Sequence, residues 1–72
     1  MPYVEEYKFL VGKNLESARK WLDYQSYLKG YLVTLRVIQK DGYYLTLNQD
    51  LRTNRLNICT QNGIITELSH FG

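Results

Sequence analysis

The sequence predicts an α+β domain in which one helix packs on a small mixed β-sheet. Three observations indicate it. Apolar residues have helical spacing over residues 15–25. Strand-like runs follow at 32–38, 56–60 and 64–68, and a long polar stretch, residues 42–55, separates the first two runs. Because parallel neighbours cannot be joined by a tight hairpin, this long connection favours a parallel pair. We therefore expect two parallel strands joined by a long loop.

The helix is predicted between a cap residue and a glycine. Apolar residues recur at spacings of three and four, as in an amphipathic helix. Asn14 is a good N-cap, and Gly30 is a suitable stop. We expect the helix to run from Leu15 to Gln25, and to Leu28 at the furthest. The residues that should face the core are Leu15, Ala18, Trp21 and Leu22.

The remaining segments are predicted as an arm and three strands. Residues 1–11 are interpreted as an irregular arm whose aromatic residues pack on the body. Residues 32–38 are apolar and rich in β-branched side chains, which favours a strand buried on at least one face. Residues 56–60 and 64–68 alternate apolar and polar positions. The Asn-Gly pair at 62–63 between them is a hairpin signal.

Composition limits the classes of function. The 72 residues form a single domain, 1–72. The single cysteine, Cys59, and single histidine, His70, provide neither a disulfide nor the four ligands of a structural zinc site. The net charge of +2 is too weak to predict a nucleic-acid partner, and no apolar run reaches the ~20 residues of a membrane span. We expect no metal, no cofactor, no nucleic acid and no membrane segment.

Enzymatic activity is not expected. The sequence has no nucleophile elbow, metal motif, phosphate loop or paired carboxylates. Cys59 fits a buried strand position, and His70 a surface position. Residues 1–8 lack the apolar core of a signal peptide, so we expect no targeting peptide. Secretion after processing and a cytoplasmic location both stay open.

The long loop, residues 42–55, is the candidate functional element. Loops longer than about 12 residues are uncommon in compact domains and are usually functional or disordered. This loop has one glycine and no proline, with leucine, threonine and tyrosine at its centre and arginines at its end. Disordered linkers are poor in aromatic and aliphatic residues. The composition therefore indicates an exposed loop that is held in place by other residues, and not a flexible linker.

Three stretches of the chain carry a family resemblance. Residues 10–19 read LVGKNLESAR, residues 42–48 read GYYLTLN, and residues 50–58 read DLRTNRLNI, with Gly72 at the end. In this order they resemble the potato inhibitor I family of serine protease inhibitors, which includes leech and barley-seed inhibitors of chymotrypsin and subtilisin. The resemblance implies a monomeric inhibitor that presents a rigid, substrate-like loop to a chymotrypsin- or subtilisin-like protease.

The resemblance leaves two positions for the reactive bond. In the family the second and third stretches share one acidic residue, whereas here they are offset by two residues. Matching from the left places the bond at Leu47–Asn48, and matching from the right places it at Gln49–Asp50. Leu47–Asn48 is preferred, because it keeps a threonine before a large apolar specificity residue.

The resemblance also implies roles for the surrounding residues. Leu47 would fill the primary specificity pocket, while Thr46 and Asn48 would hydrogen-bond the loop to its support. Arg55 would reach under the loop toward Asp50 or the loop carbonyls, and the Gly72 carboxylate is a further partner for it. Further contact positions are Tyr43, Tyr44 and Leu45, and the supporting residues are Arg52, Arg55, Asn57 and Gly72.

One departure from the family pattern supports a second function. The family often has another supporting arginine two residues after the first, and here Asn57 occupies that position. Asn57 can donate hydrogen bonds but not a charged fork. Together with the lengthened loop, this keeps open a non-inhibitory protein-binding module of the same fold. A weak binder of anionic surfaces is a more distant alternative, based only on the charge and the tyrosines.

Overall fold

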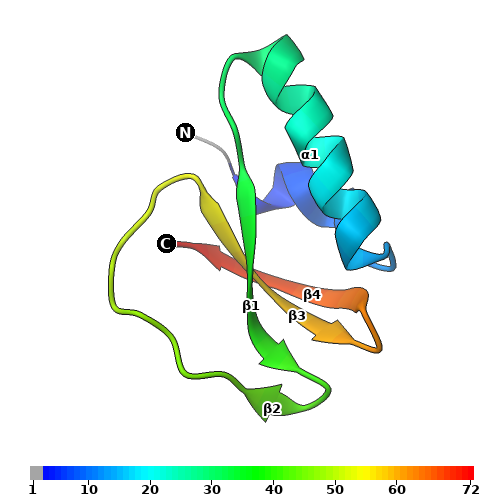
Figure 1. Cartoon of the computed structure of the whole chain (residues 1–72), viewed down its shortest axis with the longest axis vertical. Helices are drawn as coiled ribbons and strands as arrows, with labels where there is room; N and C mark the ends of the chain where they lie inside the picture. The colour runs from blue at the N-terminus through cyan, green and yellow to red at the C-terminus, as the bar shows by residue number, and fades with distance from the viewer. Residues whose placement is uncertain (1–2) are drawn as a thin grey trace.

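The structure is a computed structural model that describes residues 3–72, and it has the α+β architecture that the sequence predicts. One main helix packs on a four-stranded mixed sheet of order β2-β1-β3-β4 (Figure 1). β1 and β3 are parallel, whereas the β1–β2 and β3–β4 pairs are antiparallel. The elements are η1 (Val4–Leu10), α1 (Leu15–Lys29), β1 (Thr34–Lys40), β2 (Tyr43–Tyr44), β3 (Arg55–Gln61) and β4 (Ile64–Phe71).

Helix α1 lies between the cap and stop residues that the sequence indicated. The Asn14 side-chain oxygen accepts hydrogen bonds from the backbone N–H groups of Glu16 and Ser17, at 2.9 and 3.3 Å. Gly30 ends the helix with a φ of +79°, a left-handed conformation that glycine adopts without steric cost. The helix continues to Lys29, beyond the predicted end. Its last turn is largely exposed, so hydrophobic spacing could not mark it.

The N-terminal segment is a correction to the sequence interpretation. Val4–Leu10 is a 3₁₀ helix and not an irregular arm, and residues 1–2 of that prediction lie outside the described residues. Side chains three apart share a face of a 3₁₀ helix, which lets Tyr7 and Leu10 enter the core together. Burial raises the pKa of Tyr7 to about 12, with smaller effects from Tyr31 and Glu6.

The hydrophobic core lies between α1, η1 and one face of the sheet. Trp21 was expected to face this core, but that prediction was wrong. Its side chain is 37% exposed and packs edge-on against Phe9, with 4.7 Å between the ring centroids. Cys59 is buried in β3 as predicted, and burial followed by the Glu67 charge raises the pKa of its thiol. The core residues are Tyr7, Leu10, Ala18, Leu22, Val33, Leu35, Leu56, Ile58 and Ile65.

Two tight hairpins lie side by side at one end of the sheet. The predicted turn at residues 62–63 joins β3 to β4, and a second turn at residues 41–42 joins β1 to β2. All four turn residues have positive φ, as two-residue hairpin turns require. The Asp41 carboxylate accepts a 2.7 Å hydrogen bond from the Asn62 backbone N–H, which ties the turns together.

The second hairpin shortens the irregular part of the predicted loop. Residues 42–55 were expected to form one continuous connection, but Tyr43–Tyr44 pairs with β1 as strand β2. Asp-Gly at residues 41–42 is itself a hairpin signal that the sequence interpretation passed over. The irregular connection is therefore residues 45–54, hereafter the loop. Among residues 3–72 no helix is both long enough and apolar enough to cross a membrane.

Candidate functional site

The loop arches away from the sheet between β2 and β3, and the C-terminus lies inside the arch (Figure 1). All of its residues are exposed. Its first residue, Leu45, donates a backbone hydrogen bond of 3.0 Å to the Ile38 carbonyl. At its other end Asn54 accepts one of 2.9 Å from the Thr34 N–H and donates one of 3.1 Å to the Leu32 carbonyl. Both ends are therefore fixed to β1 or to the segment preceding it.

Arg55, the first residue of β3, reaches under the loop. Its Nη2 donates to the Asp50 carbonyl oxygen at 2.9 Å, and its Nη1 lies 3.5 Å from the Asp50 carboxylate. Its Nε donates to the Gly72 oxygen at 3.0 Å. The Arg55 side chain is only 13% exposed, whereas that of Asp50 is 41% exposed, so the guanidinium group is largely shielded from water and its acceptor on the loop is not. These are the contacts that the resemblance implied for Arg55, whereas its role in binding stays a prediction.

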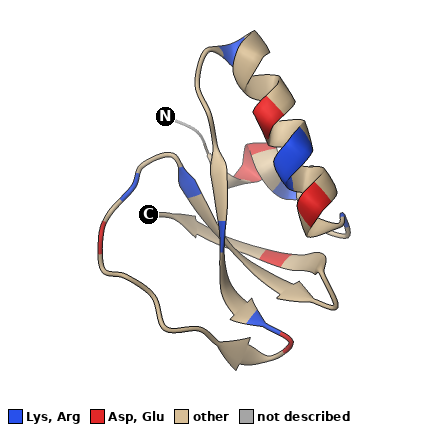
Figure 2. Ribbon diagram, in the orientation of Figure 1, with Lys and Arg blue, Asp and Glu red and all other residues tan. Residues whose placement is uncertain are grey.

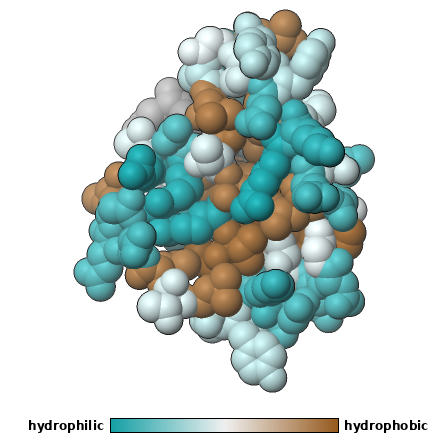
Figure 3. Space-filling model, viewed as in Figure 1, coloured by the Kyte–Doolittle hydropathy of each residue, from teal (hydrophilic) through white to brown (hydrophobic). Residues whose placement is uncertain are grey.

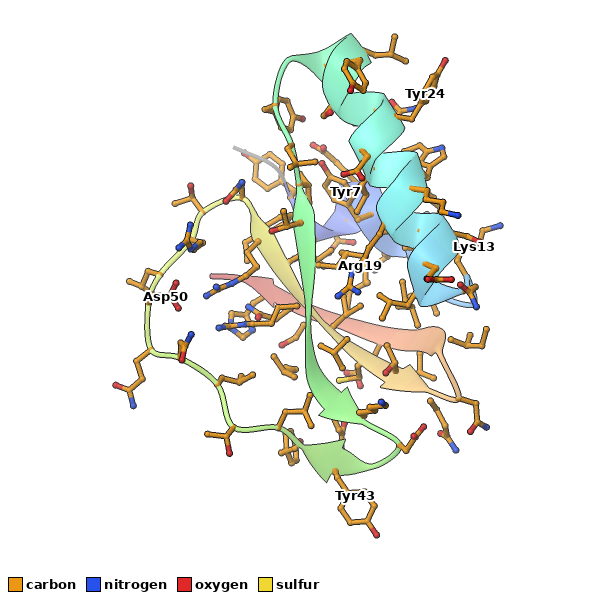
Figure 4. All side chains as sticks on the ribbon, in the orientation of Figure 1. Tyr7, Lys13, Arg19, Tyr24, Tyr43 and Asp50 are labelled. Carbon is orange, nitrogen blue, oxygen red and sulfur yellow. The ribbon has the colours of Figure 1, made fainter. Side chains whose placement is uncertain are left out.

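Asp50 is held by two arginines. Arg52 Nε lies 3.0 Å from one Asp50 carboxylate oxygen, and Arg55 Nη1 lies 3.5 Å from the same oxygen. The hydrogen bond from Arg52, followed by those from Arg55, lowers the pKa of Asp50 below its ordinary value. Figure 2 shows acidic and basic segments next to each other on this part of the loop, and Figure 4 shows the Asp50 carboxylate on the inner side of the arch.

A second arginine under the loop was missed by the sequence interpretation. Arg36 of β1 donates from Nη1 to the Asn48 carbonyl oxygen at 3.3 Å. Its Nε donates to the Asn57 side-chain oxygen at 2.6 Å, and its Nη2 to the Gly72 oxygen at 3.5 Å. The sequence did carry a signal, since Arg36 is the one charged residue in the otherwise apolar run 32–38.

Asn57 supports the loop indirectly. Its side chain is fully buried in β3, pairs with Arg36 in the parallel register and accepts the Arg36 hydrogen bond. Its amide donates to the His70 and Gly72 oxygens at 3.0 and 3.2 Å. Asn57 therefore does not replace the missing arginine directly. It fixes the arginine that does reach the loop, together with the C-terminal strand.

The predicted contact residues differ in exposure. Tyr43 and Tyr44 of β2 are 78% and 79% exposed, and Figure 4 shows Tyr43 pointing away from the sheet. Leu45 and Leu47 are about half as exposed, at 41% and 38%, whereas Leu51 is 89% exposed. In Figure 3 this face shows hydrophilic residues lying next to apolar surface.

Thr46 and Asn48 were expected to hydrogen-bond the loop to its support. Asn48 does so through its backbone carbonyl, which accepts from Arg36, whereas within residues 3–72 neither the Asn48 nor the Thr46 side chain forms such a bond. At the centre of the loop, the side chains that hold its backbone oxygens are those of Arg36 and Arg55.

Comparisons of the chain with protein-family models, characterised proteins and solved structures found no match. The function therefore rests on the residues and on the geometry described above.

Proposed function

We propose that this chain is a serine protease inhibitor of the potato inhibitor I type, with the loop as its substrate-like segment. The observation that carries the proposal is the bracing of an exposed loop through its backbone. Arg55 binds the Asp50 carbonyl, and Arg36 binds the Asn48 carbonyl. Two of the three stretches of family resemblance, residues 42–48 and 50–58, cover the same segment.

Bracing of this kind is what inhibition requires. A protease binds an extended segment and attacks one carbonyl. Ordering a flexible segment costs roughly 1–2 kcal/mol per residue of backbone, and a loop that is ordered during folding does not incur this cost on binding. If both ends of a cleaved loop stay in place, religation competes with product release. The bonds from the arginines to loop backbone would hold the ends in this way.

The geometry favours Gln49–Asp50 as the reactive bond. The carbonyl before Gln49 is held by Arg36, and Asp50 is held by Arg55 through its carbonyl and carboxylate. After cleavage between Gln49 and Asp50, one new chain end would thus stay bonded to Arg36 and the other to Arg55. Gln49 itself is exposed and lies between the two anchors, where a protease pocket can reach it.

The bond preferred from the sequence, Leu47–Asn48, has weaker support. Cleavage there would leave an upstream end at Leu47 whose nearest backbone bond to the sheet is at Leu45. Leu47 is also less exposed than Leu51, at 38% against 89%. A primary specificity residue must project fully into the protease.

Titration against subtilisin, chymotrypsin and trypsin tests the proposal. We expect tight inhibition of subtilisin, and slow cleavage that mass spectrometry maps to Gln49–Asp50. Cleavage after Leu47 would restore the other register and keep the function. Rapid cleavage of the loop without inhibition would refute the proposal.

A non-inhibitory binding module is the second candidate, favoured by the exposure of Tyr43, Tyr44 and Leu51. Aromatic side chains are enriched at the centres of protein interfaces. In that case none of the three proteases is inhibited, and the loop withstands cleavage because it is not presented as a substrate.

A further inference from the structure

We infer that Arg36 is a positioning residue for the proposed reactive bond, and that it holds the upstream side of the loop as Arg55 holds the downstream side. The effect of Arg36 on inhibition rests on the proposed function, whereas its effect on the order of the loop is tested without a protease. The family often has a second supporting arginine where this chain has Asn57 of β3, and here Arg36 of β1 supplies that support.

The parallel pairing of β1 and β3 places Arg36 where it can act. Arg36 and Asn57 are register partners, so their side chains emerge next to each other from neighbouring strands. The 2.6 Å bond from Arg36 Nε to the Asn57 side-chain oxygen orients the guanidinium group. Its planar fork then points one nitrogen at the Asn48 carbonyl and another at the Gly72 oxygen. A lysine could not bridge these three acceptors in one fixed plane.

The two arginines form one connected support. Arg36 and Arg55 both donate to the Gly72 oxygen, and Asn57 donates to it as well. From this shared point Arg36 reaches Asn48 and Arg55 reaches Asp50. The two held carbonyls flank Gln49. The residue between them is therefore fixed relative to the core by charged groups from two different strands.

After cleavage of Gln49–Asp50, Arg36 and Arg55 would each hold a different one of the two new chain ends. Hydrolysis adds water across that peptide bond and gives a carboxylate on Gln49 and an amine on Asp50. Arg36 retains the carboxylate end through the Asn48 carbonyl, while Arg55 retains the amine end. Loss of Arg36 frees the carboxylate end alone. Religation then becomes less frequent although the downstream side is unchanged.

The test compares Arg36→Gln with Arg52→Gln by ¹⁵N relaxation of the unbound protein. Arg52 also touches the loop, but its side chain is 64% exposed, and its hydrogen bond within residues 3–72 is to the Asp50 carboxylate, downstream of residues 47–49. We expect backbone order parameters at residues 47–49 to fall from about 0.85 to below about 0.6 in Arg36→Gln. We expect them to stay near the wild-type value in Arg52→Gln. Equal order at residues 47–49 in wild type and Arg36→Gln would overturn the inference.

Two further measurements separate this inference from a general loss of structure and from the proposed function. The Ile58 amide in β3 reports the fold in the same spectra. If it also becomes mobile, Arg36→Lys takes the place of Arg36→Gln, with the same expected loss of order at residues 47–49. With subtilisin, the cleaved fraction at equilibrium should rise about tenfold in the variant. A loop that loosens in a protein that never inhibits would support the Arg36 brace and refute the proposed function.

Discussion

At the scale of single residues, Arg55 has the most consequential environment. Its guanidinium group is mostly shielded from water and bonds both a loop carbonyl and the Gly72 oxygen. Hydrogen bonds from a charged group are stronger than neutral ones, and shielding preserves their strength. Arg52 contacts the same aspartate from an exposed position, where ion pairs contribute little. The two arginines that bond Asp50 therefore differ in importance.

We predict that Arg55→Ala loosens the loop while Arg52→Ala changes it little. Loss of the Arg55 bonds should weaken inhibition of subtilisin about tenfold to a hundredfold and accelerate cleavage of the loop. Inhibition constants and cleavage rates of the two variants, measured side by side, provide the check. Unchanged inhibition by Arg55→Ala would remove Arg55 from the support.

The carboxylate of Asp50 is predicted to titrate below its ordinary pKa of 3.8. The hydrogen bond from Arg52 is the largest cause, followed by the bonds and charge of Arg55. Because the folded pKa is lowered, the contribution to loop order is fully present above pH 3.8. It is lost as the pH falls further, through the folded pKa. An NMR titration of the Asp50 side chain should show this shift, and Arg52→Ala should move the pKa back up. An identical pKa in the variant would contradict the assigned cause.

At the scale of elements, β3 connects the site to the core. It is the strand between β1 and β4, and its residues 56–60 are all buried. Arg55, at the start of this strand, bonds the loop directly, and Asn57, within the strand, holds Arg36, which bonds the loop. The order of the loop therefore depends directly on the packing of β3.

We predict that Asn57→Ala destabilises the whole fold by about 1–3 kcal/mol, since it removes the hydrogen bonds of a fully buried side chain to partly buried partners. The side chain forms three hydrogen bonds, to Arg36, His70 and Gly72. Urea unfolding measures the free energy, with Asn48→Ala as the control, because Asn48 is held only through its backbone. A change in free energy as small as that of the control would show that the buried network contributes no stability.

The sequence predicted the elements whose signals are local. The Asn14 cap, the Gly30 stop and the hairpin at 62–63 follow from short-range chemistry, and the long connection correctly indicated a parallel strand pair. Arg36 could be singled out as the one charged residue of the run 32–38, but its partners could not be predicted, because they depend on the register between β1 and β3, which no short pattern specifies. The 3₁₀ helix was missed because its two buried residues span a single turn.

At the scale of the whole molecule, a small core supports a long exposed loop. The chain has 72 residues, so the fold buries only about 60% of the surface of the unfolded chain. The ends of the loop are bonded to β1 or to the segment before it, and its centre is supported from β1 and β3, where Gly72 provides a shared acceptor. The loop is thus part of the folded unit, and its order should persist until the domain unfolds.

The central claim is that the fragments of a cut loop stay in place, and religation tests it most directly. Protein cleaved at the loop is purified under native conditions and incubated with catalytic amounts of subtilisin, and the mass of the chain is followed. We predict that the intact chain reappears, by loss of one water, to the same ratio that is reached from uncut protein. If no intact chain forms and the fragments separate or are degraded further, the loop is an ordinary substrate, and the proposal that it inhibits by holding its cleaved ends in place is wrong.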